Sequence, residues 1–477
     1  MRPVRNCILI TVDCLRADHV GAYGYPKPTT PFLDSLAKKS AVFENFFSNG
    51  PFTPAAMLAM LASTYPLDFG SLLPVPESAL FLPQHCARHG IRSIGLSSNV
   101  AILHELTGYH KGFEKFELLL RSGWRAAHEG LLSGFARRLR PRIAHAFGGG
   151  RLFRFSRNMF YLLQYLGIAS SEIPGENAFA VTAAIRRVVA DQANERFFLW
   201  AHYIDPHLPR ISEARWESQV AGRTLTPHRR RFLNSLRASI NVCRNERERE
   251  DIVLMYDAEI AKVDAALSEL WKFLEASGRA DDTAVIITAD HGEELFEHGR
   301  FWHDARFYEP SLYIPCIVHV PGVLPATVPQ LASSIDIAPT ICALLGIAAP
   351  ALYTGTSLVD SKKQEKPERE RVIAQAECDK SGNLFLDNVL ATPGGARREG
   401  IFRHAIRSRR YKYIWDESSG AEEWYDLTAD PKETKSNPEL REAPEMRALV
   451  DELRAFRAAQ KAGVKEKEEE YLRYFFR

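Results

Sequence analysis

Four residues with complementary chemistry stand at the ends of apolar runs in this sequence. Asp13 follows an apolar run near the N-terminus, Asp290 and His291 follow another far downstream, and Thr53 precedes Pro54 at the start of a third. Carboxylates and imidazole are ligands for divalent cations, and a hydroxyl beside such a cation becomes a nucleophile. Together these side chains predict a metal-activated site that cleaves an ester, with Thr53 as the attacking group.

The proline after Thr53 indicates how the hydroxyl is presented. Because proline is favoured at the first position of a helix, Thr53 is expected at a helix N-terminus, where N–H groups and the helix dipole attract anions. Each residue also has an ordinary structural interpretation. Thr53 can be a helix N-cap, Asp13 a loop acid, and Asp290 with His291 a turn at Gly292. Their combination in the right strand context favours a site.

Histidines in polar clusters after other predicted strands supply further candidates. His202, Asp205 and His207 follow one apolar run, and His303 comes shortly after the strand that leads to the metal ligands. His207 and His303 can donate to the oxygens of an ester or protonate its leaving group. His202 and Asp205 are predicted to contact the substrate. The alternative for a loop histidine is a solvated or structurally satisfied side chain.

The bulk composition is that of an ordinary soluble globular protein. The chain has 477 residues, 45% hydrophobic and 25% charged, with a formal net charge of +2. This balance favours neither a nucleic-acid partner nor, over the whole chain, a membrane. We expect no signal peptide and no transmembrane run. Seven dispersed cysteines without CxxC pairs fit reduced thiols in a cytoplasmic protein, and of these only Cys14 lies near the predicted chemistry.

Short β-rich apolar runs alternate with helical patterns, which predicts an α/β fold with a parallel or mixed sheet flanked by helices. Strands are expected at 7–12, 91–97, 196–203, 284–289 and 315–320. Helices are expected at 31–39, 55–62, 175–192, 252–278 and 334–345. Active sites of such sheets form beyond the carboxyl ends of strands, so Asp13 and Asp290 are predicted to meet there.

The chain is predicted to divide into a long catalytic part and a charged C-terminal part. The units are a catalytic domain at 1–360 with insertions near 118–174 and 210–250, a small C-terminal sheet subdomain at 361–440, and a charged helix at 441–477. Within the first insertion, the segment 121–157 carries nine arginines and one acid. We interpret it as a helical surface subdomain with solvated arginines. The alternative is a lid that contacts an anionic substrate or a membrane surface.

Several motifs, in order along the chain, resemble the sulfatase branch of the alkaline phosphatase superfamily. They lie at 12–19 (VDCLRADH), 21–24 (GAYG), 30–37 (TPFLDSLA), 256–264 (YDAEIAKVD), 289–294 (ADHGEE), 334–340 (SIDIAPT) and 423–431 (EWYDLTADP). The resemblance implies an alkaline-phosphatase-like three-layer sandwich with a central, mostly parallel mixed sheet and a small C-terminal α+β subdomain. It further implies that Asp13, Asp290 and His291 hold the metal and that position 53 is the nucleophile. By the same resemblance, His207 and His303 contact the substrate.

Departures from the family pattern restrict the chemistry. Sulfatases of this family convert a Cys or Ser, followed by a Pro-Ser-Arg-like element, into formylglycine, whereas residues 53–57 here read TPAAM. Cys14 stands where a second acid is usual, and residues 95–99 read GLSSN where a lysine-bearing motif is usual. No formylglycine is therefore expected. The set around Thr53 looks more like relatives that move phosphoryl groups through a threonine.

The sequence thus predicts a sulfatase-family ester hydrolase with one divalent metal ion (Ca, Mn, Mg or Zn) and a covalent Thr53 intermediate. Its substrate is expected to be a small anionic sulfate, phosphate or phosphonate ester, and Thr53 favours phosphorus over sulfur. One alternative is a phosphotransferase of the phosphoglycerol or phosphoethanolamine type. An alternative of another class is a catalytically degenerate protein that binds an anionic glycan or lipid. The sequence leaves open whether the protein forms a homo-oligomer.

Overall fold

The computed structural model describes residues 3–120, 177–192, 195–235, 243, 245–359, 369–379, 382 and 400–476. The basic segment 121–157 lies outside these residues, and so does most of the insertion predicted at 118–174. The predictions of a lid or a membrane contact for 121–157 stay predictions, as do the domain limits.

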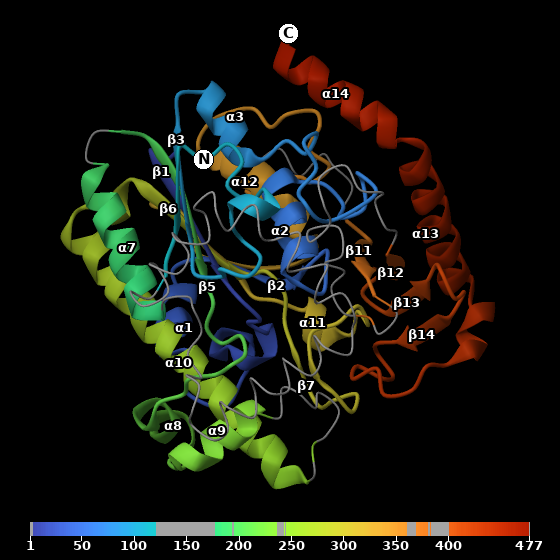
Figure 1. Ribbon diagram of the computed structural model, residues 1–477, viewed down its shortest axis with the longest axis horizontal. Coiled ribbons are helices and arrows are strands. Elements are labelled where there is room, and N and C mark those ends of the chain that lie inside the picture. Colours follow the sequence, from blue (N-terminus) through green and yellow to red (C-terminus); the bar gives the residue numbers. More distant parts are fainter. Residues whose placement is uncertain are drawn as a thin grey trace, which may run out of the picture.

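A large mixed sheet forms the centre of the described part of the chain (Figure 1). Its strands run in the order β10-β2-β9-β6-β1-β5-β3-β4. Their bounds are β1 Asn6–Val12, β2 Ala41–Phe47, β3 Arg92–Ser97, β4 Lys115–Leu118, β5 Phe197–Tyr203, β6 Thr283–Ala289, β9 Cys316–His319 and β10 Ala326–Ser333. The stretch from β6 to β4 is parallel, and β9 lies antiparallel to both of its neighbours. The mostly parallel mixed sheet is confirmed.

The three central strands are buried because of their sequences. Every residue of β1, β5 and β6 is buried, and the three runs are apolar almost throughout. Near-continuous apolar runs are typical of parallel strands that are covered on both faces. The strands expected at 7–12, 196–203 and 284–289 are therefore confirmed within one residue.

Helices cover both faces of the sheet, as Figure 1 shows. One face carries α1 Pro31–Ala37, α7 Ala178–Asp191 and α10 Glu246–Ala276, with α8 Ala214–Ala221 and α9 Pro227–Ser235 beside the N-terminal part of α10. The other face carries α2 Thr53–Ala62, α3 Leu82–Arg88 and α12 Ile337–Leu344. Shorter elements are α11 Glu309–Leu312, η1 Ala17–His19, η2 Gly21–Tyr23, η3 Glu105–Thr107, η5 Arg279–Asp281, η6 Ser334–Asp336 and η8 Pro438–Glu442. No helix in the described ranges is long and apolar enough to span a membrane.

Two strands at the far edge of the sheet, β2 and β10, were not expected from the sequence. Polar residues interrupt β2 at Glu44 and Asn45, and Pro329 interrupts β10. Proline removes a backbone donor, and in sheets it is confined to edges and bulges. The register of β10 on β2 shifts between Val328 and Leu331, around this proline. Such strands lack the clean apolar pattern by which β1 was found.

A second, antiparallel sheet follows the catalytic part. It contains β11 Val372–Cys378, β12 Ile401–Arg407, β13 Tyr411–Asp416 and β14 Glu422–Asp426, within the segment 361–440 for which the sequence indicated a small sheet. Helix α13 (Pro444–Ala462) packs on this sheet, as seen at the right of Figure 1, and buries Met446, Leu449 and Leu453. Helix α14 (Val464–Phe476) follows, and its Tyr474 contacts His85 of α3. A small hairpin joins β7 (Glu294–Leu295) to β8 (Phe301–Trp302).

Candidate active site

The two predicted acids meet because their strands are neighbours. Val12 pairs with Ala289 in the parallel register of β1 and β6, so Asp13 and Asp290 leave the sheet side by side at its carboxyl edge. Both side chains are fully buried. Two carboxylates this close repel each other when ionised, and burial removes the water that would screen them. The pair therefore requires hydrogen-bond donors or a cation.

Two side chains hold one oxygen of Asp13. Its Oδ2 accepts from Asn99 Nδ2 at 2.9 Å and lies 3.2 Å from His202 Nε2. The other ring nitrogen of His202 is 2.9 Å from the Thr11 hydroxyl, which in turn accepts from Trp200 Nε1. His202 is thus a buried support for Asp13. This supporting role replaces the substrate contact predicted for His202. One oxygen, Oδ1, remains directed toward His291.

Asp290 is held differently. Its Oδ1 accepts from the backbone N–H of His291 at 2.8 Å and of Cys14 at 3.3 Å. Within the described residues, its buried Oδ2 has no hydrogen-bond partner. Burial, together with the charge of Asp13, raises the pKa of Asp290. Burial also opposes ionisation of Asp13, but the charge of His207 and the hydrogen bond from His202 outweigh it and hold the pKa of Asp13 well below its usual range.

His291 presents one nitrogen to both acids. Its Nδ1 donates to the carbonyl of Gly292 at 2.8 Å, which leaves the lone pair on Nε2. Nε2 lies 3.7 Å from Asp13 Oδ1 and 3.5 Å from Asp290 Oδ2. A backbone acceptor on the far ring nitrogen is the usual arrangement of a metal-binding histidine. The predicted grouping of Asp13, Asp290 and His291 is therefore present in the structure.

Thr53 completes this group. It is the first residue of α2, 4% exposed, and its Oγ1 lies 3.3 Å from His291 Nε2. The N-cap is Phe52, whose extended backbone (φ −156°) precedes the helix. The interpretation of Thr53 as an ordinary N-cap is therefore wrong, because its hydroxyl is directed at His291. The start of α2 places backbone N–H groups beside the hydroxyl, where they favour an anion.

The four side chains fit a divalent cation. Ligands about 2.1 Å from a tetrahedral ion lie about 3.4 Å apart. The distances from His291 Nε2 to Thr53 Oγ1, Asp290 Oδ2 and Asp13 Oδ1 are 3.3, 3.5 and 3.7 Å. The unpartnered Oδ2 of Asp290 is directed into this space, which is the position a cation would satisfy.

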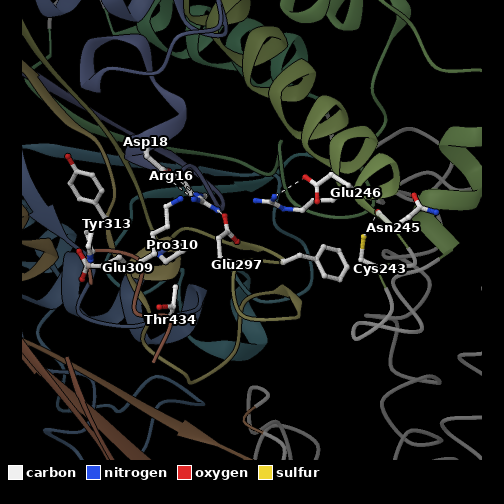
Figure 2. A pocket seen from close by; sticks show the side chains of 14 residues that line it. Arg16, Asp18, Cys243, Asn245, Glu246, Glu297, Glu309, Pro310, Tyr313 and Thr434 are labelled. Carbon is white, nitrogen blue, oxygen red and sulfur yellow. Dashed lines mark hydrogen bonds and ion pairs between the residues drawn. The ribbon is translucent and has the colours of Figure 1, made fainter. Parts of the chain in front are cut away.

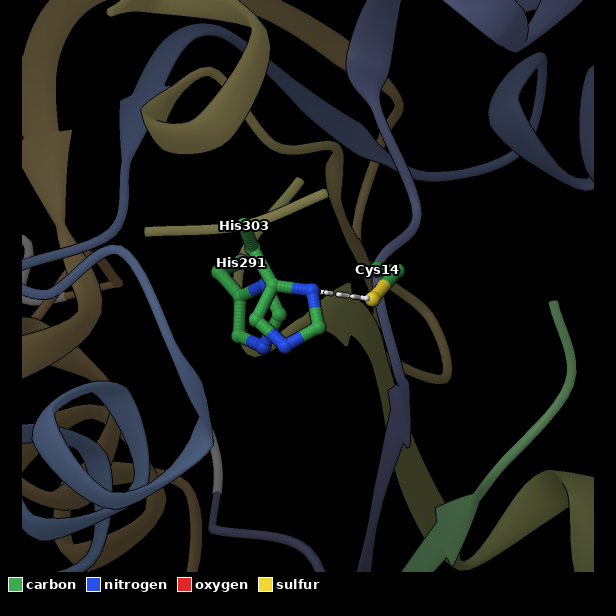
Figure 3. A group of neighbouring side chains, drawn as sticks. All are labelled: Cys14, His291 and His303. Carbon is green, nitrogen blue, oxygen red and sulfur yellow. Dashed lines mark hydrogen bonds between the residues drawn. The ribbon is translucent and has the colours of Figure 1, made fainter. Parts of the chain in front are cut away.

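The two other predicted histidines lie beside this group. The ring centroid of His303 is 4.6 Å from that of His291 and 5.1 Å from that of His207. Trp302 stacks on His303 with centroids 4.4 Å apart. Figure 3 shows His303 next to His291, with its Nδ1 directed at the sulfur of Cys14. Both histidines therefore lie beside His291, and their predicted contacts with the ester stay predictions.

Asp205 does not join the cluster. One of its oxygens is 3.1 Å from Lys262 Nζ, and the other accepts from the backbone N–H of Ala178 at the start of α7. Lys262 also pairs with Glu259 at 2.6 Å. This buried ion network joins α7 and α10 to the loop after β5. The substrate contact predicted for Asp205 is therefore replaced by a structural role.

An ion pair that the sequence did not reveal lies behind His303. Arg210 and Glu293 form a direct buried ion pair, and Glu293 Oε1 lies 3.5 Å from His303 Nδ1. Burial lowers the pKa of Arg210 to about 10. Arg210 belongs to the segment 210–250, which the sequence suggested to be a charged excursion.

Cys14 also belongs to the site. The sequence indicated only that this cysteine lies near the predicted chemistry. Its backbone adopts a left-handed conformation with φ 62°, and its carbonyl accepts from the Tyr256 hydroxyl at 2.6 Å. Its thiol is 3.1 Å from Asp13 Oδ1. Burial, followed by the charges of Asp13 and Asp290, raises the pKa of the thiol well above its ordinary value.

A cavity of about 880 Å³ lies beside Arg16 (Figure 2). It is lined by Arg16, Asp18, Cys243, Asn245, Glu246, Arg249, Phe296, Glu297, Glu309, Pro310, Tyr313, Pro431, Lys432 and Thr434. Arg16 is bound to Asp18 and Glu297 and also donates to the carbonyl of Glu293 at 3.0 Å. The lining does not include Thr53 or the acids around it. This cavity is therefore separate from the cluster of Thr53.

Comparison with known proteins identifies the family. A family model described as Sulfatase matches residues 5–347. The chain belongs to the sulfatase family. This confirms the resemblance drawn from the motifs, all but one of which (423–431) lie within the matched residues.

Individual relatives agree with this family assignment. Choline-sulfatase of Rhizobium meliloti (strain 1021) is 23% identical over 460 residues, which cover 90% of this chain and 81% of that protein. Arylsulfatase K of Bos taurus is 30% identical over 191 residues, 39% of this chain, and the match spans only 33% of that protein. The phosphonate monoester hydrolase from Silicibacter pomeroyi has 17% identity and a TM-score of 0.66, covering 96% of this chain and 95% of that chain.

The likeness to the solved structure confirms the alkaline-phosphatase-like fold class. Family membership and the similarity to choline-sulfatase support an ester hydrolase. Within the described residues, three groups of His, Cys and Asp side chains could hold a metal ion, and all three lie in the cluster described above.

The Arg210–Glu293 pair gives a first testable prediction. Arg210→Met is expected to lower the free energy of unfolding by about 3–5 kcal/mol, because it leaves the buried carboxylate of Glu293 without its partner. The double variant Arg210→Met/Glu293→Met removes both charges and is expected to recover part of this loss. Denaturant unfolding followed by circular dichroism measures both. A single variant as stable as the unmodified protein would contradict the role of the pair.

Proposed function

We propose that this protein is a metal-dependent ester hydrolase in which Thr53 forms a covalent intermediate, and that its substrates are phosphate or phosphonate esters rather than sulfate esters. One observation carries the proposal. The Thr53 hydroxyl lies 3.3 Å from the free nitrogen of His291, at a helix N-terminus and beside two buried acids. A nucleophile, a cation position and an anion-stabilising helix end therefore coincide.

Asp13, Asp290 and His291 would hold the cation. When bound, a divalent cation lowers the pKa of a neighbouring hydroxyl and neutralises charge that develops on an anionic ester. The backbone N–H groups at the start of α2 face the same position and stabilise the oxygens of the ester. The residues around the cluster hold these groups in place before the substrate arrives, which is the condition for electrostatic catalysis.

The reaction then has two displacements at phosphorus. Thr53 releases its proton to the solvent and its Oγ1 bonds to phosphorus, while the bond from phosphorus to the leaving alcohol oxygen breaks. His303 or His207 gives a proton to that oxygen, since both rings lie beside the cluster. A water molecule then attacks the phosphorylated Thr53, and phosphorus is released as the free acid while the threonine hydroxyl is restored.

The identity of residue 53 favours phosphorus over sulfur. The family resemblance implies that sulfatases use a formylglycine made from Cys or Ser, and residues 53–57 read TPAAM. A threonine hydroxyl can take up and release a phosphoryl group without that modification. The relative named phosphonate monoester hydrolase shares the fold, although its identity of 17% shows no more than the fold. The retained cluster of acids and histidines weighs against a protein that binds without turnover.

The nucleophile gives the second prediction. Thr53→Ala is expected to lower kcat/KM by about 10³-fold or more, because the attacking oxygen is removed. Thr53→Ser keeps a hydroxyl and is expected to retain turnover. Both variants should melt close to the unmodified protein, since the change is one small side chain at the start of α2. Steady-state kinetics with an aryl phosphodiester measures the effect, and unchanged turnover in Thr53→Ala would contradict the mechanism.

The third prediction concerns the metal. Removal of divalent ions with a chelator is expected to abolish turnover, and one of Mn, Zn, Mg or Ca should restore it. Asp290→Asn is expected to weaken metal binding by about 100-fold or more, because the oxygen directed into the site loses its charge. Asp281→Asn changes an exposed acid in the same way and serves as the matched control. Titration calorimetry on the metal-free proteins measures the affinities, and full turnover in a metal-free preparation would refute the proposal.

The fourth prediction separates the two ester classes. With each of the four metals, aryl phosphonate monoesters or phosphodiesters are expected to have a kcat/KM at least about tenfold above that of the matching aryl sulfate, equal to about 1.4 kcal/mol in transition-state free energy. All substrates carry the same leaving group, so a difference in kcat/KM reflects the phosphorus or sulfur centre alone. Turnover of the sulfate ester alone would overturn the preference for phosphorus while leaving the hydrolase itself intact.

A further inference from the structure

The segment between β2 and α2 leads directly to the predicted nucleophile. Residues 48–53 are all buried, and Thr53 is the first residue of α2. Gly50 packs against the first turn of this helix, because a Cβ atom on Gly50 would lie 2.2 Å from the Cβ of Ala55. Close-packed contacts of this kind transmit a displacement instead of absorbing it. A shift of residues 49 and 50 would therefore move the start of α2 and, with it, the Thr53 hydroxyl.

Asn49 fixes this segment to the C-terminal sheet. It is fully buried, its Nδ2 donates to the carbonyl of Ile373 at 2.7 Å, and its own carbonyl accepts from the N–H of Gln375 at 2.9 Å. Both partners belong to β11, which is an edge strand of that sheet. On the other side, Asn49 Oδ1 accepts from the backbone N–H of Ile335 at 3.0 Å. One asparagine thus joins the segment to two distant parts of the chain.

Tyr109 holds the same segment at its helical end. The residue is fully buried, and its hydroxyl donates to the carbonyl of Pro54 at 2.8 Å. Pro54 directly follows Thr53, so this contact lies in the first turn of α2. Burial, followed by the charge of Asp290, raises the pKa of the Tyr109 hydroxyl well above its ordinary value. The hydroxyl therefore keeps its proton and remains a donor to Pro54.

We propose that Asn49 and Tyr109 are positioning residues for the nucleophile, which hold residues 49–54 so that Thr53 Oγ1 stays 3.3 Å from His291 Nε2. The inference rests on the proposed function, in which Thr53 attacks phosphorus. Both residues act through the backbone of the segment and not on the ester. A misplacement of a reacting group by about 1 Å can cost about 100-fold in rate. Asn49 thereby links the C-terminal sheet to the active site.

Steady-state kinetics of the metal-loaded protein with an aryl phosphodiester tests the effect on turnover. Asn49→Ala is expected to lower kcat by about 10–100-fold. KM is expected to stay within about twofold, because a displaced nucleophile weakens the transition state and not the binding of the substrate. Tyr109→Phe keeps the ring and is expected to lower kcat by about 2–10-fold, which corresponds to the loss of one neutral hydrogen bond.

Two matched variants separate positioning from a merely structural role. Asn6→Ala removes an equally buried amide at the start of β1, where Nδ2 donates to Asp282 Oδ1 at 3.1 Å and Oδ1 accepts from the N–H of Phe197 at 3.3 Å. Tyr413→Phe removes a hydroxyl that donates to Glu422 within the C-terminal sheet. Both controls are expected to lose stability as the test variants do, yet to keep kcat within about twofold.

Hydrogen exchange of the substrate-free protein measures the segment without any turnover. The N–H of Ala56 donates to the carbonyl of Phe52 at 3.1 Å and reports on the first turn of α2. In the peptide that contains Ala56, exchange is expected to be at least about tenfold faster in Asn49→Ala, with a smaller increase in Tyr109→Phe. Asn6→Ala is expected to leave this peptide unchanged.

Unchanged exchange at the start of α2 in the two test variants would overturn the proposal, and so would a kcat equal to that of the unmodified protein. If Asn49→Ala does not fold as judged by circular dichroism, Tyr109→Phe decides by the same two criteria. An unmodified chain that turns over no phosphorus ester would refute the proposed function alone. The exchange rates would then still decide whether Asn49 and Tyr109 hold the segment.

Discussion

The pairing of Asp13 and Asp290 at the carboxyl edge of two neighbouring parallel strands is the constraint on which the site depends. The register of β1 and β6 places the two acids side by side, and both are fully buried. Two such charges are costly without compensation. The surrounding donors satisfy the outer oxygens: Asn99 and His202 bind Asp13, and backbone N–H groups bind Asp290. The inner oxygens, Asp290 Oδ2 and Asp13 Oδ1, face His291, and Asp13 Oδ1 also lies 3.1 Å from the Cys14 thiol.

The remaining parts of the site surround the position between Asp13 and Asp290. The start of α2 places the Thr53 hydroxyl beside His291, and the hairpin that follows β6 places His303 next to the same ring. The Arg210–Glu293 pair stands behind His303 and joins the loop after β5 to the loop after β6. Groups from distant parts of the chain therefore converge because each follows a strand or begins a helix at one edge of the sheet. This convergence is how an open α/β sheet builds an active site.

Sequence reasoning succeeded where chemistry and apolar pattern coincide. Asp13 and Asp290 stand at the ends of uninterrupted apolar strands, so their meeting could be predicted from topology rules alone. It failed where a contact depends on loops. Asp205 looked like a site residue because it lies between two histidines, yet Lys262, on a helix more than fifty residues away, takes its carboxylate. The pairing of Arg210 with Glu293 and the left-handed backbone of Cys14 leave no pattern in the sequence, because they arise only when distant segments pack.

The central claim is that Thr53 carries the ester's phosphorus during turnover. It is tested most directly by acid quench of the metal-loaded protein within the first turnover of an aryl phosphonate or phosphodiester, followed by peptide mapping with mass spectrometry. The account predicts a phosphorus adduct on the peptide that contains Thr53, localised to that residue, which disappears as water completes the reaction. Turnover with an adduct on another residue, or a first turnover that releases product without any adduct, would contradict it.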